Sequence, residues 1–222
     1  MKTQQITELG YDMKCIQRYI DKLEEKDPYT KGHSHHVFIV TQAIVTRLSE
    51  KRQKQINKNM LYTAALLHDI GKVMIPDEIL NKESPLNDNE RNTMNDHPKM
   101  GKDMLQNTVF EPLQNWILYH HERIDGKGYY HLEGEHIPFE SRIIAVADTF
   151  SALRTYRSYR PALSIQETKQ IMQQACCTQL DKEVVEALLS MELEQIRTLR
   201  CNCGICQQRR SELGLDEDDE AI

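Results

Sequence analysis

Histidines and aspartates beside apolar residues are the feature of this sequence that most suggests chemistry. His33 stands one helical turn before Val37, and His68 follows the apolar run 64–67 and immediately precedes Asp69. A carboxylate or imidazole buried on an apolar face costs several kcal/mol unless it is paired or bound to a metal. These residues are therefore candidates for a metal site or for a buried polar network.

Three more segments carry residues of the same two types. His97 is followed by Pro98 at a helix break, and the pair His120 and His121 ends an apolar segment. Asp148 lies within the apolar stretch IIAVADTFSAL. Imidazole and carboxylate are the ligands that Fe, Mn and Zn accept. Each residue alone is also consistent with a satisfied core side chain, so the spacing leaves both interpretations open.

Asp69 is the natural candidate for a bridging ligand because it adjoins His68. Two metals about 3.5–4 Å apart need a shared carboxylate and several histidines. A water between such metals would lose a proton near neutral pH and become a hydroxide nucleophile.

The elements that position these residues are predicted to be helices, because apolar residues recur mostly at helical spacing. The expected helices are 11–26, 37–48, 61–68, 88–106, 109–120, 139–154, 164–177 and 181–199. Gly71 is expected to end the third helix as its C-cap. Residues 121–138 hold three of the nine glycines and read as a loop. The fold class is therefore all-α, with an N-terminal helix over 1–26, a main domain over 27–198 and a flexible acidic tail over 199–222.

Composition excludes several classes of partner. The net charge of −6 gives no basic footprint for DNA or RNA. The longest apolar runs, such as 143–147, are too short to span a membrane, and the first ten residues lack the apolar core of a signal peptide. The cytoplasm is the expected location, and the six cysteines are expected to be reduced thiols.

The sequence resembles the HD phosphohydrolase superfamily, and within it the HD-GYP subfamily of metal-dependent cyclic-dinucleotide phosphodiesterases. LLHDIGK carries the histidine-aspartate pair that is the superfamily signature. The longer set of matches runs in order along residues 27–190: DPYTKGHSHHV, ALLHDIGKVMIPDEILNKESPL, HPKMG, HHERIDGKGYY and IPFESRIIAVADTFSALRTYRSYR.

The resemblance implies a compact helical bundle around a buried, carboxylate-bridged centre of two divalent metal ions, most often Fe or Mn. The ligands that it implies are His33, His68, Asp69, His97, His120, His121 and Asp148. Tyr29 stands where some members hold a third metal through a glutamate, which favours two metals. His36 stands where the family commonly has an arginine, so we leave His36 out of the ligand set.

The activity that the resemblance implies is hydrolysis of a cyclic dinucleotide, with cyclic di-GMP as the leading substrate. Lys72 would contact a phosphate or protonate the leaving oxygen, although it also fits a plain helix-end cation. Arg157 and Arg160 align with cations that contact substrate phosphates, and a solvated helix face is their alternative. Tyr129 would stack on a base or only pack. Arg123 and Asp125 are expected to pair across the turn of the loop.

This chain departs from the family pattern at three positions beyond His36. Tyr130 replaces the proline of the GYP motif, which adds a backbone donor, and Ser158 replaces another proline. Ser151 replaces an aspartate, which is expected to remove a hydrogen-bond acceptor near the site. A catalytically weak nucleotide sensor and an HD phosphohydrolase for another nucleotide therefore stay open as alternatives. A homodimer or a signalling-protein partner also stays open.

The tail contains three cysteines at C-x-C-x2-C spacing, Cys201, Cys203 and Cys206. They could help to bind zinc with Cys176 or Cys177 as a fourth ligand, because structural zinc takes four ligands. Reduced cysteines at a frayed end are the simpler interpretation.

Overall fold

The chain folds into a bundle of helices, as its sequence predicts. The computed structural model describes residues 12–27, 32–155 and 162–199. Within these ranges the only extended pairing is a single bridge between Cys176 and Leu180. Among the same residues, no helix combines the length and the apolar character needed to cross a bilayer.

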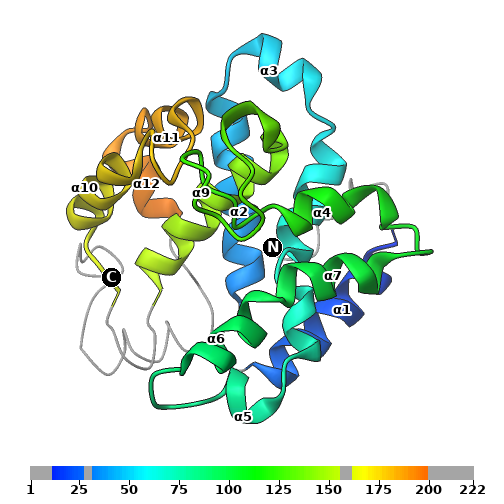
Figure 1. Cartoon of the computed structure of the whole chain (residues 1–222). Coiled ribbons are helices and arrows are strands. Elements are labelled where there is room, and N and C mark those ends of the chain that lie inside the picture. Colours follow the sequence, from blue (N-terminus) through cyan, green and yellow to red (C-terminus); the bar gives the residue numbers. More distant parts are fainter. Residues whose placement is uncertain (1–11, 28–31, 156–161, 200–222) are drawn as a thin grey trace.

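Helices α2 (His33–Arg47) and α9 (Phe139–Arg154) form the centre of the bundle (Figure 1). Both are buried along their length, and their buried faces include polar residues such as His36 and Ser151, so neither helix is strongly amphipathic. Helix α4 (Lys58–Leu67) packs on α2, and α1 (Met13–Lys26) packs on α4. Helix α1 buries Ile16, Ile20 and Leu23, which share one face.

The C-terminal helices cover the other side of this centre. They are α10 (Ile165–Ala175), α11 (Lys182–Leu189) and α12 (Leu193–Thr198). The predicted single helix over 181–199 is wrong, because the chain ends α11 at Ser190 and starts again at Glu192. There Glu192 and Gln195 form a capping box, which satisfies backbone N–H groups of the new helix.

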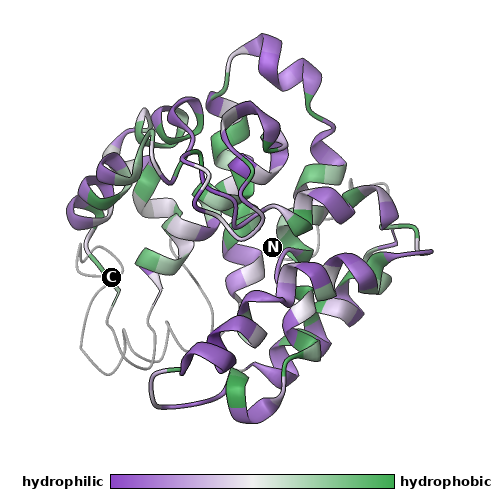
Figure 2. Cartoon of the chain, in the orientation of Figure 1, coloured by the Kyte–Doolittle hydropathy of each residue, from purple (hydrophilic) through white to green (hydrophobic). Residues whose placement is uncertain are grey.

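Shorter helices and 3-10 helices connect these longer helices. They are α3 (Glu50–Gln55), η2 (Ile70–Met74), α5 (Asp77–Leu80), α6 (Asp88–Asn95), α7 (His97–Leu105), η3 (Glu111–Leu113), α8 (Gln114–Leu118) and η4 (Gly134–His136). Helices α3 and α6 bury no residue and are largely hydrophilic (Figure 2). They lie at the periphery, so the buried site is built by the remaining elements.

Three predicted helices differ from the observed ones near the site. The segment 88–106 divides into α6 and α7 at Asp96, because Pro98 lacks an N–H and fits only the first turn of a new helix. The segment 109–120 contains only η3 and α8. Helix α4 ends with His68 as its C-cap, and Gly71 lies inside η2 instead of capping the helix.

Gly71 has a steric reason for being glycine. A Cβ at Gly71 would lie 1.9 Å from the carbonyl oxygen of His97 and 2.5 Å from the backbone nitrogen of Gly101. Helix α7 therefore approaches η2 backbone to backbone. This close approach brings His97 beside Asp69, which immediately precedes η2.

Candidate metal centre

Three buried histidines are oriented by the helical turn that precedes each of them. Each Nδ1 lies within hydrogen-bond distance of the carbonyl oxygen three residues earlier: 2.9 Å for His68 to Ala65, 2.8 Å for His97 to Met94 and 2.6 Å for His120 to Ile117. A carbonyl can only accept, so each Nδ1 carries the proton and each Nε2 keeps its lone pair. A metal-binding histidine is usually held in this way. We refer to these three residues as the carbonyl-bound histidines.

The Nε2 atoms of the carbonyl-bound histidines converge on one carboxylate, that of Asp69. The Nε2 atoms of His97 and His120 lie 3.1 and 3.9 Å from its Oδ1, and that of His68 lies 3.4 Å from its Oδ2. None of the three Nε2 atoms has a hydrogen-bond partner among the described residues. Buried lone pairs that face a carboxylate need a cation between them. The donor set therefore fits a divalent metal ion.

Asp69 belongs to two overlapping groups of potential ligands. One group is Asp69, His97, His120 and His121, and the other is His33, His68 and Asp69. The ligand atoms within each group lie within 4.8 Å of one another. A carboxylate shared by two groups is the arrangement expected of a bridging ligand.

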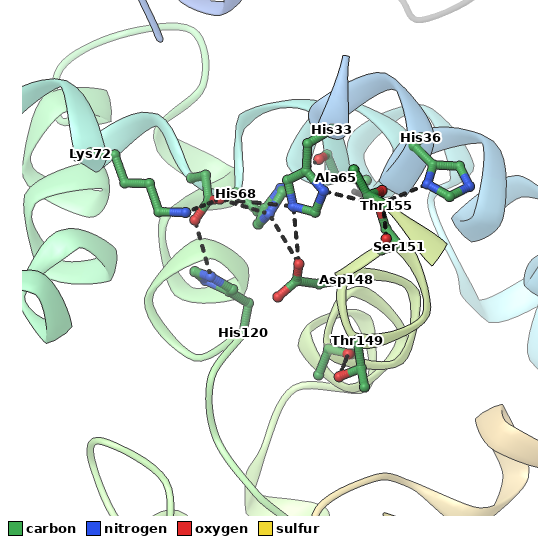
Figure 3. A network of polar contacts seen from close by, with 12 residues as sticks. His33, His36, Ala65, His68, Lys72, His120, Asp148, Thr149, Ser151 and Thr155 are labelled. Atoms are coloured by element: carbon green, nitrogen blue, oxygen red, sulfur yellow. Dashed lines mark hydrogen bonds and ion pairs between the residues drawn. The ribbon is translucent and has the colours of Figure 1, made fainter. Parts of the chain in front are cut away.

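Asp148 completes the cluster from helix α9. Its Oδ1 lies 3.1 Å from His33 Nε2 and 3.9 Å from His68 Nε2 (Figure 3). The seven residues that the resemblance implies as ligands thus come from separate segments and lie together at one buried site.

Burial and neighbouring charges set the protonation of the cluster. Burial lowers the pKa of His121 to about 3 and that of His120 well below its usual range, with neighbouring histidines adding to the effect. Burial alone would raise the pKa of Asp69, but the charge of Lys72 and the contacts of His68 lower it well below the usual range. Neutral imidazoles and an ionised carboxylate are the forms that bind metal.

The pKa values of His33 and His68, the two histidines near Asp148, are shifted in opposite directions. Burial lowers the pKa of His33, and its contact with the Asp148 carboxylate only partly compensates. Burial also lowers the pKa of His68, but its contacts with Asp69, Asp148 and the Ala65 carbonyl together outweigh burial, and the net pKa is raised. The carbonyl-bound geometry still leaves the Nε2 of His68 directed at the carboxylates.

Lys72 and Tyr129 are the predicted substrate-contacting residues that the structure describes. Lys72 Nζ lies 2.6 Å from Asp69 Oδ2. Burial lowers the pKa of Lys72, but the contact with Asp69 and the charges of Asp27 and Asp148 together outweigh burial, so the net pKa is raised and the lysine stays charged. Tyr129 is 39% exposed, and its ring centroid lies 5.1 Å from that of His121 at the edge of the cluster. The predicted residues Arg157 and Arg160 lie outside the described residues, as do Tyr29, Ser158 and the three tail cysteines.

The loop after His121 is held by a buried carboxylate that sequence reasoning overlooked. Glu122 Oε1 accepts from the backbone N–H of Tyr130, and its Oε2 accepts from that of Leu132, both at 2.7 Å. The donor that Tyr130 adds is therefore used. A Cβ at Gly128 would lie 2.6 Å from Glu122 Cα, so close approach explains this glycine, whose φ is not positive. Gly126 does have a positive φ, of 71°.

Arg123 and Asp125 pair across the turn, as predicted. Their side chains form two hydrogen bonds of 2.9 and 2.7 Å, and this contact lowers the pKa of Asp125 to about 2. The backbone N–H groups of Ile124 and Asp125 donate to the carbonyls of Gln179 and Thr178, so the loop is also attached to the turn after α10.

His36 and Ser151, two positions where this chain departs from the family pattern, contact each other beside the cluster. Ser151 Oγ lies 2.9 Å from His36 Nδ1 and 2.9 Å from His33 Nδ1. Ser151 still offers a hydroxyl oxygen within hydrogen-bond distance of His33 Nδ1, although it lacks the carboxylate of an aspartate. The spacing of three residues between His33 and His36 was the available signal, since such residues share a helix face.

Comparison with known proteins gives a family match and several similar sequences. A family model described as an HD domain matches residues 18–184. A protein of Vibrio cholerae serotype O1 named cyclic di-GMP phosphodiesterase is 39% identical over 142 residues, which are 60% of this chain and 29% of that protein. The 3'3'-cGAMP-specific phosphodiesterase 3 of the same organism is 35% identical over 179 residues, which are 79% of this chain and 38% of that protein.

The cyclic di-GMP phosphodiesterase response regulator RpfG of Xanthomonas campestris pv. campestris is 34% identical over 191 residues, which are 83% of this chain and 50% of that protein. The chain thus spans half or less of the length of these three relatives.

Two solved structures share the fold. Bd1817, described as an HDG"Y"P protein from Bdellovibrio bacteriovorus, aligns with a TM-score of 0.55 and 20% identity over 71% of this chain and 51% of that chain. The HD domain of the L. monocytogenes phosphodiesterase PgpH aligns with a TM-score of 0.52 and 16% identity over 82% of this chain and 98% of that chain. At these identities the likeness concerns the fold alone.

Proposed function

We propose that this chain, which belongs to the HD domain family and resembles its HD-GYP members, hydrolyses a phosphodiester bond of a cyclic dinucleotide. The observation that carries the proposal is the position of Asp69 in both groups of ligands, with three unpartnered Nε2 atoms directed at it. The relatives support the reaction class, because three that are 34–39% identical are named as phosphodiesterases of cyclic dinucleotides.

Two divalent ions, Fe or Mn, are the proposed cofactors of this cluster. The proposed ligands are His33, His68, Asp69, His97, His120, His121 and Asp148. When bound, such ions supply a water nucleophile near neutral pH and neutralise phosphate oxygens. The chain contributes the orientation, because the carbonyl-bound histidines hold their lone pairs toward the ions before binding.

Lys72 is proposed to contact a substrate phosphate. Its net raised pKa makes it a stable cation and a weak acid, so attraction to a phosphate suits it better than proton donation to the leaving oxygen. Its ammonium lies beside Asp69, and therefore beside the position where the two groups of ligands meet. Arg157 and Arg160 are proposed to bind the second phosphate, since a guanidinium can bond two oxygens at once.

Tyr129 is proposed to border the substrate at the rim of the site. It is partly exposed and lies against His121, and the Glu122 hydrogen bonds hold the loop that carries it. Its ring offers a face on which a base can stack.

Cyclic di-GMP is the substrate we propose, although relatives named for 3'3'-cGAMP have comparable identity. The test is to purify the protein with Mn²⁺ or Fe²⁺ and to measure hydrolysis of cyclic di-GMP and 3'3'-cGAMP by product chromatography. Turnover of cyclic di-GMP that is lost in Asp69→Ala is expected. Tight binding without turnover would contradict the proposed hydrolase activity and indicate a nucleotide sensor. Faster turnover of 3'3'-cGAMP would overturn only the substrate choice.

The location and assembly of the protein are not addressed by this site. A cytoplasmic location, and a homodimer or a signalling-protein partner, stay predictions.

A further inference from the structure

A chain of hydrogen bonds runs from the C-terminal end of α12 to His33. His36 Nε2 contacts the carbonyl oxygen of Leu199, and His36 Nδ1 contacts Ser151 Oγ. Ser151 Oγ in turn contacts His33 Nδ1, while His33 Nε2 faces Asp148 (Figure 3). Helices α2 and α9 and the residue after α12 thus meet through three side chains, and His33, His36, Ser151 and Leu199 are all buried.

The carbonyl at one end gives this chain a single direction. The Leu199 carbonyl can only accept, so a neutral His36 carries its proton on Nε2 and presents a lone pair at Nδ1. The Ser151 hydroxyl has one hydrogen, and that hydrogen must go to His36 Nδ1. The Ser151 oxygen is then left to accept from His33 Nδ1.

The direction of this chain decides whether His33 Nε2, the atom that faces the metal site, carries a proton or a lone pair. If Nδ1 of a neutral imidazole carries the proton, Nε2 has the lone pair. In a neutral His33 without this chain, Nε2 could carry the proton instead and donate it to Asp148 Oδ1, 3.1 Å away. That tautomer cannot bind a metal through Nε2.

We propose that Ser151 and His36 are positioning residues that hold His33 in the tautomer that binds metal, with the Leu199 carbonyl setting the direction of the chain. The proposal rests on the proposed function only in treating His33 as a metal ligand. It gives the two departures at positions 36 and 151 one shared purpose. Buried hydrogen-bond partners of metal-bound histidines have this effect in general, since they fix both tautomer and ring orientation.

The direct test is the tautomer of His33 in metal-free protein, measured by ¹⁵N NMR of the imidazole nitrogens above the usual histidine pKa. The wild-type protein is expected to show the Nδ1–H form. Ser151→Ala is expected to shift His33 toward the Nε2–H form. Ser151→Asn supplies one amide donor and one carbonyl acceptor, so it is expected to retain the Nδ1–H form.

Metal affinity is the second readout, measured by titrating metal-free protein with Mn²⁺. Ser151→Ala is expected to bind Mn²⁺ roughly 10- to 100-fold more weakly, the range typical for loss of such a partner. Ser141→Ala is the matched control, because Ser141 is a buried serine on the same helix whose hydroxyl donates to the Trp116 carbonyl. It is expected to keep wild-type Mn²⁺ affinity.

His36→Phe tests the other member of the chain with a ring of similar size. The Ser151 hydroxyl can then donate within its own helix and still accept from His33, so the loss of Mn²⁺ affinity is expected to be smaller than in Ser151→Ala. The double variant is expected to lose no more than Ser151→Ala alone, because both changes break one chain. Circular dichroism verifies that each variant is folded.

Three results would overturn the inference: an Nε2–H tautomer of His33 in the wild type, an unchanged His33 tautomer in Ser151→Ala, or additive losses in the double variant. These outcomes are independent of the proposed activity. A wild-type protein that shows the predicted tautomers but does not cleave cyclic dinucleotides would contradict the proposed function and support the positioning chain.

Discussion

The carbonyl-bound histidines and His33 reach the same cluster by two different routes. His68, His97 and His120 are each oriented by a carbonyl three residues earlier in their own turn. His33 is oriented by Ser151, 118 residues away, and through His36 by Leu199. The first arrangement forms wherever the local turn forms. The second requires α2, α9 and the end of α12 to be packed together, so it is the more vulnerable to substitution.

The largest effect is expected where the two routes meet, at Asp69. Asp69→Ala removes the carboxylate shared by both groups of ligands, so Mn²⁺ affinity should fall by more than the roughly 100-fold that loss of a supporting residue can cause. Mn²⁺ at 100 times its Kd should stabilise the wild type by about 2.7 kcal/mol, whereas the same concentration should leave Asp69→Ala nearly unchanged. Thermal unfolding with and without Mn²⁺ measures this, and equal stabilisation of both proteins would contradict the shared ligand.

The second-largest effect is expected at Gly71, whose close contact with helix α7 holds His97 near Asp69. Gly71→Ala places a methyl group against the His97 carbonyl and should cost about 1–3 kcal/mol or more by overpacking. Because the clash separates His97 from Asp69, Mn²⁺ affinity should fall as well.

Gly134→Ala is the control for Gly71→Ala. Gly134 has a positive φ of 53°, with open space where the Cβ would lie. Its substitution should cost about 1–2 kcal/mol in backbone strain and leave Mn²⁺ affinity unchanged. Equal Mn²⁺ affinity in the two variants would show that the glycine contact does not set the histidine spacing.

A smaller effect is expected at Glu122, which holds the loop after His121 and contributes to neither route of histidine orientation. In Glu122→Gln the amide nitrogen would face a backbone N–H, so one of the two hydrogen bonds is lost, at about 1–3 kcal/mol. The loop that carries Tyr129 should loosen, which raises KM for the cyclic dinucleotide and leaves Mn²⁺ affinity unchanged. Glu135→Gln, at an exposed position of the same loop, should change neither quantity. A lower Mn²⁺ affinity in Glu122→Gln would mean that the loop helps to build the metal cluster.

The smallest effect is expected on the carbonyl-bound histidines when Ser151 is replaced. In Ser151→Ala, the imidazole ¹⁵N signals of His68, His97 and His120 should keep the Nδ1–H pattern, because their carbonyl partners are unaffected. A change in those three tautomers together with His33 would show that the cluster behaves as one coupled network, and the distinction between local and long-range orientation would fail.

The outline of the protein was predictable from local patterns. Helical spacing predicted the all-α fold. The ordered motifs gave the HD-GYP resemblance, and that resemblance implied the seven residues that gather in the cluster. Helix ends were predicted less well. Periodicity continues through Asp96 and through Ser190, where Pro98 and the Glu192 capping box start new helices.

The residues that support the site were not predictable in the same way. Glu122 looks like any charged loop residue, yet it is buried and bonded to two backbone N–H groups of a distant part of its loop. His36 and Ser151 looked like separate departures, because nothing along the chain places residues 115 positions apart within hydrogen-bond distance.

The sequence by itself determined the ligand types, the helical turns and, through those turns, the orientation of His68, His97 and His120. Such contacts span three residues, so they need only the local turn to form. Only the tertiary structure decided that these Nε2 atoms meet at Asp69 and that His33 depends on Ser151 and His36. The physical reason is distance along the chain: side-chain hydrogen bonds reach about 3 Å, and only packing of α2, α9 and the residues after α12 brings those groups within that range.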